Sequence, residues 1–209
     1  NNMEYIAPKL EQYSFFANMS DMLDFDEVKF SKVIKLSRPR KRALKPGYKK
    51  YKLINKKIFE TGIGRRVLKS ELTEGKGINI YSANVCSVFG KIDKEILTDY
   101  SRPSILWGID GDWMVNIIDA NKKFYPTDHC GYIRILVDNI MPEFLAMALE
   151  VEGKLEKFSR ANRASTDRIR KISIFVPEDV NEQKRILNEI NSEKSKKKKD
   201  ELIRKYFVE

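Results

Sequence analysis

The only histidine of this 209-residue chain, His129, lies in the stretch YPTDHCG (125–131), between Asp128 and Cys130. Histidine beside cysteine and aspartate could form a nucleophilic pair or contribute to a metal site. A metal site needs three or four ligands, and besides carboxylates this chain could offer only His129, Cys130 and Cys86. A nucleophilic pair needs the imidazole to face the thiol, whereas neighbours on an extended strand point to opposite faces. We therefore expect neither a catalytic nor a metal site here.

The simplest interpretation of YPTDHCG is a turn that enters the strand YIRILV (132–137). Thr127 or Asp128 would hydrogen-bond the backbone, and Gly131 would permit the bend. His129 then becomes a turn residue whose ring is available for binding. His129 is therefore a candidate residue for contact with a ligand that binds at the protein surface.

Two other groups of acidic residues resemble catalytic or metal-binding patterns. In GIDGDW (108–113), Asp110 and Asp112 flank Gly111, but the rest of a calcium-loop pattern is missing. A β-turn between two strands explains Asp-Gly more economically. PEDVNEQK (177–184) contains the residue types of a metal-dependent nuclease. Its acidic residues lie at the start of a helix, where Glu178 and Asp179 interact favourably with the helix N-terminus.

Several short β-rich runs must provide the scaffold for these turns, because Gly, Asn and Asp separate them at turn positions. They are YKLI (51–54), INIYSA (78–83), SILWGI (104–109), YIRILV (132–137) and KISIFVP (171–177). The sequence MPEFLAMALEVEGKLEKF (141–158) predicts a helix from its 3.6-residue apolar period and from Pro142 at its first turn. The fold class predicted is therefore mixed α/β of the α+β type.

The C-terminal stretch (180–209) predicts one helix of about 25 to 30 residues. Its apolar stripe lapses over Lys196 to Lys199 and then returns. An isolated helix would leave these apolar residues in water, so we expect them to bind a partner or a second copy of the chain. The predicted contact residues are Ile186, Leu187, Ile190, Leu202, Ile203 and Phe207.

Charge is unevenly distributed in this chain of net charge +10. Residues 29–69 hold 16 Lys or Arg and one acidic residue, Glu60, with Phe and Tyr among the cations. Such a patch is typical of proteins that bind the phosphate backbone of nucleic acids. An acidic protein partner is the alternative that charge alone leaves open. No apolar run is long enough for a membrane span, and two cysteines form no disulfide framework, which favours a cytoplasmic protein.

The order of several sequence blocks resembles the target recognition domain of type I restriction-modification specificity subunits. The blocks are INIYSANVCSVFG, PSILWGIDGDWMVN, KFYPTDHCGYIRI and FSRANRASTDRIRKISIFVPEDVNEQKRI. The ending, in which a strand is followed by Pro, a few residues, Glu-Gln and a helix, is a hallmark of that family. The resemblance covers about residues 50 to 190. Similar domains also form the C-terminal part of single-chain, type IIG-like methyltransferase-restriction proteins.

The resemblance implies a module that recognises a short DNA sequence and performs no chemistry. A methyltransferase partner, and a restriction subunit where present, would bring S-adenosylmethionine, ATP and Mg²⁺, so we expect no cofactor in this chain. The sequence contains no glycine-rich cofactor loop and no Asn/Asp-Pro-Pro-aromatic run. A complete specificity subunit has two recognition domains and two helices. The chain is therefore either a half-subunit that dimerises or a piece of a larger polypeptide.

Two Arg-rich loops suit DNA contact best, because guanidinium groups bind phosphates and the O6/N7 edge of guanine. They are TGIGRRVLKS (61–70), with flexible Gly62 and Gly64, and FSRANRASTDR (158–168). The full set of predicted DNA-binding residues is Arg65, Arg66, Lys69, Tyr81, Ser82, Asn84, His129, Arg160, Asn162, Arg163 and Arg168. Tyr81 could instead belong to the core.

The predicted organisation has three parts. Residues 1–47 form an N-terminal lead-in and basic linker, 48–178 the DNA target recognition domain, and 179–209 the helix for dimerisation or methyltransferase docking. A function of another class stays open at this stage, namely a basic protein-interaction module without sequence-specific DNA binding.

Overall fold

A computed structural model describes residues 43–208 of the chain. Most of the predicted N-terminal lead-in and basic linker (1–47) lies outside the described residues. Nine strands and four α-helices form the described part, together with one short 3-10 helix, η2 (Lys69–Glu71). None of the helices between residues 43 and 208 combines the length and apolarity that crossing a membrane requires.

A four-stranded antiparallel sheet forms the centre, in the order β2 (Phe59–Ile63), β8 (Cys130–Ile135), β5 (Ser104–Gly108) and β6 (Val115–Ile118). Alternating residues of β5 and β8 belong to two different cores, as the two-residue period of a strand requires. Trp107 and Ile133 lie in the main core, whereas Leu106 and Cys130 lie in a second apolar cluster. Both faces of this sheet are therefore covered.

Helix α3 (Pro142–Leu155) contributes to the main core with the buried side chains Phe144, Leu145, Ala148 and Leu149. Pro142 occupies its first turn, where the missing N–H has no intrahelical partner to lose. A second small sheet pairs β1 (Tyr48–Lys52) with β9 (Ser173–Pro177) in antiparallel register. The short helix α4 (Thr166–Arg170) leads into β9, and its buried Ile169 joins the same core.

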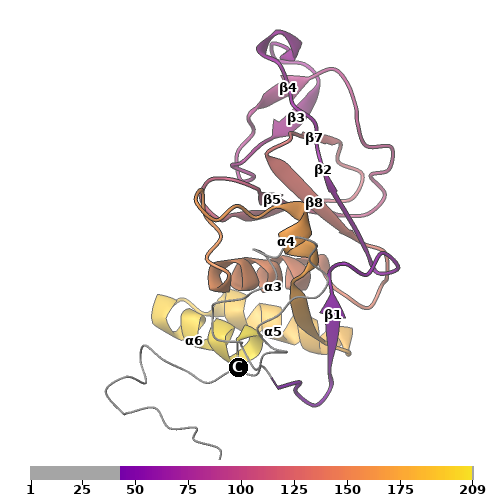
Figure 1. Cartoon of the computed structure of the whole chain (residues 1–209). Coiled ribbons are helices and arrows are strands. Elements are labelled where there is room, and N and C mark those ends of the chain that lie inside the picture. The colour runs from indigo at the N-terminus through magenta and orange to yellow at the C-terminus, as the bar shows by residue number, and fades with distance from the viewer. Residues whose placement is uncertain (1–42, 209) are drawn as a thin grey trace, which may run out of the picture. The chain divides into compact units, whose positions relative to one another are not determined.

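Three further strands form a lobe at the end of the described unit opposite α5 and α6 (Figure 1). They are β4 (Gly90–Ile92), β3 (Ile78–Tyr81) and β7 (Phe124–Pro126), with β3 and β7 parallel. Ile80, Ile92 and Tyr125 form a small buried cluster within it. The lobe meets the central sheet because β7 continues through a turn into β8.

The C-terminal stretch is two helices, α5 (Val180–Ser192) and α6 (Lys196–Phe207), so the prediction of one continuous helix is wrong. Glu193 and Ser195 adopt extended backbone conformations between them. The Ser195 N–H donates to a Glu193 carboxylate oxygen at 2.8 Å, and the Ser195 hydroxyl accepts from the Lys198 N–H. Polar side chains that bond the backbone in this way compete with helix and favour a cap.

The apolar residues predicted to bind a partner are used inside the chain instead. Ile186, Leu187, Ile190 and Phe207 are buried in the main core, and the Phe207 ring lies 4.8 Å from that of Phe144. Leu202 and Ile203 are half-buried against the same core. The helix break lets α6 fold back and bury its own stripe, so the expectation that a partner must cover it is corrected.

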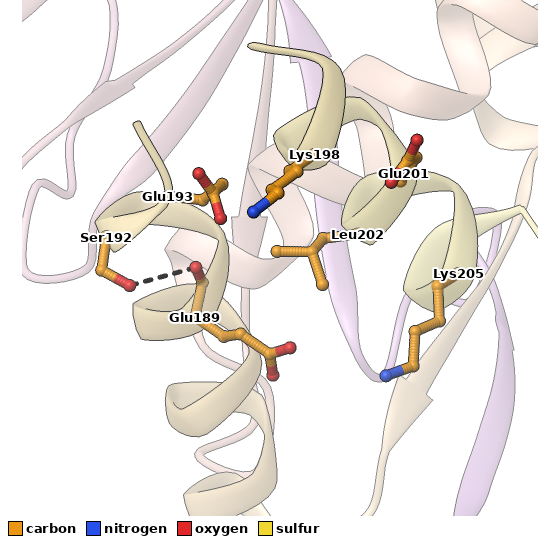
Figure 2. A pocket seen from close by; sticks show the side chains of 7 residues that line it. All are labelled: Glu189, Ser192, Glu193, Lys198, Glu201, Leu202 and Lys205. Atoms are coloured by element: carbon orange, nitrogen blue, oxygen red, sulfur yellow. Dashed lines mark hydrogen bonds between the residues drawn. The ribbon is translucent and has the colours of Figure 1, made fainter. Parts of the chain in front are cut away.

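A groove of about 510 Å³ lies between α5 and α6 (Figure 2). Leu202 is its one apolar lining residue. The other lining residues are acidic, basic or polar: Glu189, Ser192, Glu193, Lys198, Glu201 and Lys205. Ser192 donates a hydrogen bond to the Glu189 carbonyl at 3.1 Å. A lining of mixed charge does not favour an anion or a cation, so this groove is no candidate nucleic-acid site.

Gln183 connects α5 to the rest of the fold through a fully buried side chain. Its Oε1 accepts from the Met141 N–H, and its Nε2 donates to the carbonyls of Asn139 and Pro177, each at 2.8 Å. A buried amide normally needs such partners because an unpaired polar group in the interior is costly. The Gln of the Glu-Gln pair therefore joins the start of α3 to the junction of β9 and α5.

Candidate nucleic-acid interface

Backbone hydrogen bonds join the turn before β8 to four other segments of the chain, one of them through Ile109. The bonds run from Gly64 N to Cys130 O (3.3 Å), Arg65 N to Pro126 O (3.2 Å), Thr127 N to Tyr81 O (2.9 Å), Ile109 N to His129 O (3.0 Å) and Ala164 N to Ile109 O (2.8 Å). Both predicted Arg-rich loops belong to this network. The structure thus places them beside one turn, YPTDHCG, which no spacing in the sequence shows.

The turn itself has the predicted form. Cys130 N donates to the Thr127 carbonyl at 3.0 Å, and His129 N donates to the Thr127 hydroxyl at 3.2 Å. Thr127 also donates its hydroxyl to Ser82 Oγ at 3.0 Å. Gly131 has another role than the one predicted, because it lies in β8, where a Cβ would come within 2.2 Å of the Trp107 ring. Close packing, not the bend, requires glycine there.

His129 finds its partner in the GIDGDW turn. Its Nδ1 lies 2.8 and 2.9 Å from the two carboxylate oxygens of Asp110, and an Arg163 guanidinium nitrogen donates to Asp110 at 3.2 Å. The predicted turn between two strands is confirmed, since β5 and β6 pair as a hairpin and Gly111 has a φ of 109°. Asp110 was predicted only as a turn residue. Its partners lie 19 and 53 residues away, so no local pattern reveals them.

Both Arg-rich loops carry exposed cations. Arg65, Arg66, Lys69 and Arg160 are exposed, and their side chains form no ion pair with any residue between 43 and 208. Unpaired guanidinium and ammonium groups keep all their donors for a ligand. Cationic side chains free of acidic neighbours are what a polyanion requires.

Gly62 and Gly64 act differently from the flexible glycines that the sequence suggests. A Cβ on Gly62 would meet the Tyr132 ring at 2.3 Å, and one on Gly64 would lie 1.7 Å from the Pro126 carbonyl oxygen. Neither residue has a positive φ. Both allow β2 and the loop after it to pack tightly, which fixes the position from which Arg65 projects.

The family model for the type I restriction modification DNA specificity domain matches residues 48–202. A match over most of the chain decides the assignment. The chain belongs to this family. The comparison with curated proteins found no match.

Three solved structures share the fold of this specificity domain. The S subunit of the type I restriction-modification system from M. genitalium is 16% identical, with a TM-score of 0.52 over 76% of this chain and 40% of that one. The HsdS subunit from Thermoanaerobacter tengcongensis is 17% identical, with a TM-score of 0.55 over 79% and 41%. A chain from a study of complex assembly and conformational transition of the type I R-M system is also 17% identical, with a TM-score of 0.54 over 78% and 42%. The specificity domain described here spans less than half the length of these relatives.

Asn162 and Arg168, both predicted to contact DNA, form hydrogen bonds within and beside the second Arg-rich loop of the specificity domain (158–168). Asn162 donates from Nδ2 to the carbonyls of Glu156 (2.9 Å) and Lys157 (3.2 Å), and its Oδ1 accepts from Arg168. Arg168 also donates to the Arg163 carbonyl at 3.0 Å. The amide of Asn162 is fully occupied in this structure. Asn162 and Arg168 thus shape the loop that carries Arg163, and their contact with DNA stays a prediction.

The residues predicted in IYSANV are similarly engaged. The half-buried Tyr81 packs edge-on against Phe124, with ring centroids 6.5 Å apart, in the second core cluster. Asn84 accepts from the Cys86 N–H at 3.0 Å, forming a local turn. Ser82 accepts from Thr127, as described above. All three side chains thus have partners within the protein, and their contact with DNA stays a prediction.

The thiol of Cys130 and the imidazole of His129 do not face each other as a nucleophilic pair would require. Cys130 is fully buried, and burial raises the pKa of its thiol, so the reactive thiolate is disfavoured. The imidazole of His129 faces Asp110 and not this thiol. Between residues 43 and 208 no three His, Cys, Asp or Glu side chains gather as a metal site would require.

Proposed function

We propose that this chain is the DNA-recognition module of a restriction-modification system and directs a partner methyltransferase or endonuclease to its target site. The observation that carries the proposal is that backbone hydrogen bonds join both Arg-rich loops to one turn, the second loop through Ile109, and that both loops carry exposed, unpaired cations. Membership of the specificity-domain family supports it. Chemistry then belongs to the partner, which would supply S-adenosylmethionine and, where cleavage occurs, ATP or Mg²⁺.

Duplex DNA is the expected ligand because the free cations on the interface match a phosphate backbone. Arg65 and Arg66 would contact phosphates, since they follow the tightly packed Gly64 and project without ion pairs. His129 and Arg163 are joined through Asp110 within the loop network. Phosphate contacts position a protein on the duplex, and contacts with base edges provide specificity.

Salt dependence of binding tests the phosphate contacts. The double substitution R65A/R66A should weaken binding to every duplex sequence and lower the slope of log K against log salt by about 0.9 for each phosphate that is no longer neutralised. A matched control is K196A/K197A, which removes the same charge from the exposed start of α6. Equal effects of the two double variants would contradict the proposal, because net charge alone would then explain binding.

Sequence discrimination separates this function from that of a general basic module. Competition between duplexes of different sequence should change affinity at constant salt if the chain recognises bases. An interaction module for acidic proteins would bind all duplexes equally. The purified chain should also transfer no methyl group to DNA from labelled S-adenosylmethionine until a methyltransferase subunit is added, and incorporation by the chain alone would overturn the assignment.

A further inference from the structure

Asp110 stands at the meeting point of three separate segments of the interface. It lies in the β5–β6 turn, His129 in the turn before β8, and Arg163 in the loop before α4. Backbone hydrogen bonds join the same segments through residues next to these three: Ile109 donates to the His129 carbonyl, and Ala164 donates to the Ile109 carbonyl. The three side chains are therefore held together by the fold as well as by their own contacts.

The contact with Asp110 determines which ring nitrogen of His129 carries hydrogen. A carboxylate only accepts hydrogen bonds, so Nδ1, at 2.8 Å from it, must be the donor. In the neutral ring Nε2 is then left as an acceptor. The carboxylate oxygen nearest to Nε2 is Oδ1 of Asp128, and at 3.8 Å it lies beyond hydrogen-bond distance. Nε2 is thus available to a ligand.

The carboxylate of Asp110 is less exposed to solvent than the side chains of His129 and Arg163 that it contacts. The side chain of Asp110 is 26% exposed, whereas those of His129 and Arg163 are 45% and 56% exposed. Arg163 makes a single bond to Asp110 through one terminal nitrogen. Most of its five N–H donors therefore remain for a ligand.

We propose that Asp110 is a positioning residue that presents His129 and Arg163 as one unit for recognising base edges in the major groove. The proposal rests on the function proposed above and specifies how the interface would select its sequence. Arg163 offers the forked donors that match O6 and N7 of guanine. His129 offers an acceptor, which matches the exocyclic amine of adenine or cytosine. The unit therefore recognises two neighbouring positions of the target.

A surface ion pair without a ligand would contribute little to the fold, so the arrangement needs a reason other than stability. The chain contains a comparison in Asp138, which pairs with Arg102 at 3.1 Å and is 92% exposed. Asp138 follows the C-terminal end of β8, whereas His129 precedes the N-terminal end of that strand. The Asp138–Arg102 pair has the same Asp–Arg chemistry but no histidine and no link to the loop network, which makes D138N the matched control for D110N.

Selection of duplexes from a pool with a randomised segment tests the proposal on the full chain. The wild type should enrich one sequence pattern, and H129A and R163A should each lose preference at a different position, by about 5- to 150-fold. Asp110→Asn keeps the shape but leaves one acceptor oxygen for two donors. It should lose preference at both positions, while its affinity for unrelated duplexes stays equal or rises because a negative charge is removed.

The outcomes distinguish this inference from the function on which it rests. If the wild type enriches a pattern and D110N enriches it equally strongly, the positioning role is wrong and the recognition function stands. If D110N weakens binding to all duplexes by the same factor, its role is structural and the inference also fails. If the wild type enriches nothing, both the function and the inference are overturned. D138N should match the wild type throughout.

Discussion

The substitution Gln183→Glu gives a demanding test of how this fold is held together. The new side chain has nearly the same shape and can still accept from the Met141 N–H. It replaces the Nε2 group, which donates to the Asn139 and Pro177 carbonyls at 2.8 Å each, with an oxygen that faces both. The site is fully buried, so water cannot compensate.

The expected loss can be worked out from these hydrogen bonds. Each of the two buried carbonyls left without its donor costs about 1 to 3 kcal/mol, about 2 kcal/mol on average. The free energy of unfolding should therefore fall by about 4 kcal/mol, a large fraction of the total for a domain. With a urea dependence of about 2 kcal/mol per molar, the midpoint of unfolding should fall by about 2 M.

The loss should also depend on pH in a defined direction. Burial beside two carbonyl oxygens disfavours the charged form and raises the folded-state pKa of the new carboxyl above its ordinary value. The protonated carboxyl can donate to one carbonyl. Stability is therefore retained at low pH and lost as pH rises through the raised pKa, so the loss should be smaller near about pH 5 than near about pH 8.

Urea unfolding followed by circular dichroism at both pH values measures the effect. The matched control is N188D, the same amide-to-acid change on the exposed side of α5. It should leave the midpoint almost unchanged. The reasoning is refuted if Q183E unfolds at the same urea concentration as N188D, or if its loss does not change between the two pH values.

Three further outcomes are expected. One thiol, that of exposed Cys86, should react rapidly with an aromatic disulfide reagent, and buried Cys130 only in denaturant, because burial raises its pKa; two fast thiols would contradict the packing. Phe207→Ala should lower the free energy of unfolding by about 3 to 5 kcal/mol in thermal or urea melts, since the ring is buried in the core; a loss below about 1 kcal/mol would show that α6 is detached. Gly64→Ala should weaken duplex binding measured by fluorescence anisotropy, because its Cβ would overlap the Pro126 carbonyl and push the loop outward; unchanged affinity would show that this loop does not contact DNA.

The amino-acid sequence by itself determined the features that depend on local patterns. Apolar periodicity predicted α3, and β-branched runs predicted the strands that became β3, β5, β8 and β9. The acidic residues Glu178 and Asp179 were predicted to lie at a helix start, and the Asp179 carboxylate indeed accepts from the Asn181 N–H at 2.8 Å at the start of α5. The ordered blocks also predicted the family, which is confirmed. These signals are readable because a few neighbouring residues produce each of them.

No residue range was predicted for strands β2, β4, β6 and β7, although the turn GIDGDW predicted a strand after β5, and α4 was not predicted. Two of the four strands have only three residues, too few for an alternating pattern to be recognised. Strand β2 contains Gly62, a poor strand former that is favoured there only because the Tyr132 ring lies against it. Pairing with neighbours, and not intrinsic preference, makes these segments extended.

The tertiary structure alone decided the break between α5 and α6 and the composition of the interface. The apolar stripe of α6 is compatible with an extended helix on a partner and with folding back on its own chain. Helix α6 folds back on its own chain because burying Phe207 against Phe144 in the core stabilises the fold. Likewise, Asp110, His129 and Arg163 meet only because hydrogen bonds join three loops. Sequence patterns encode local conformation, whereas contacts over 19 and 53 residues depend on how the whole chain packs.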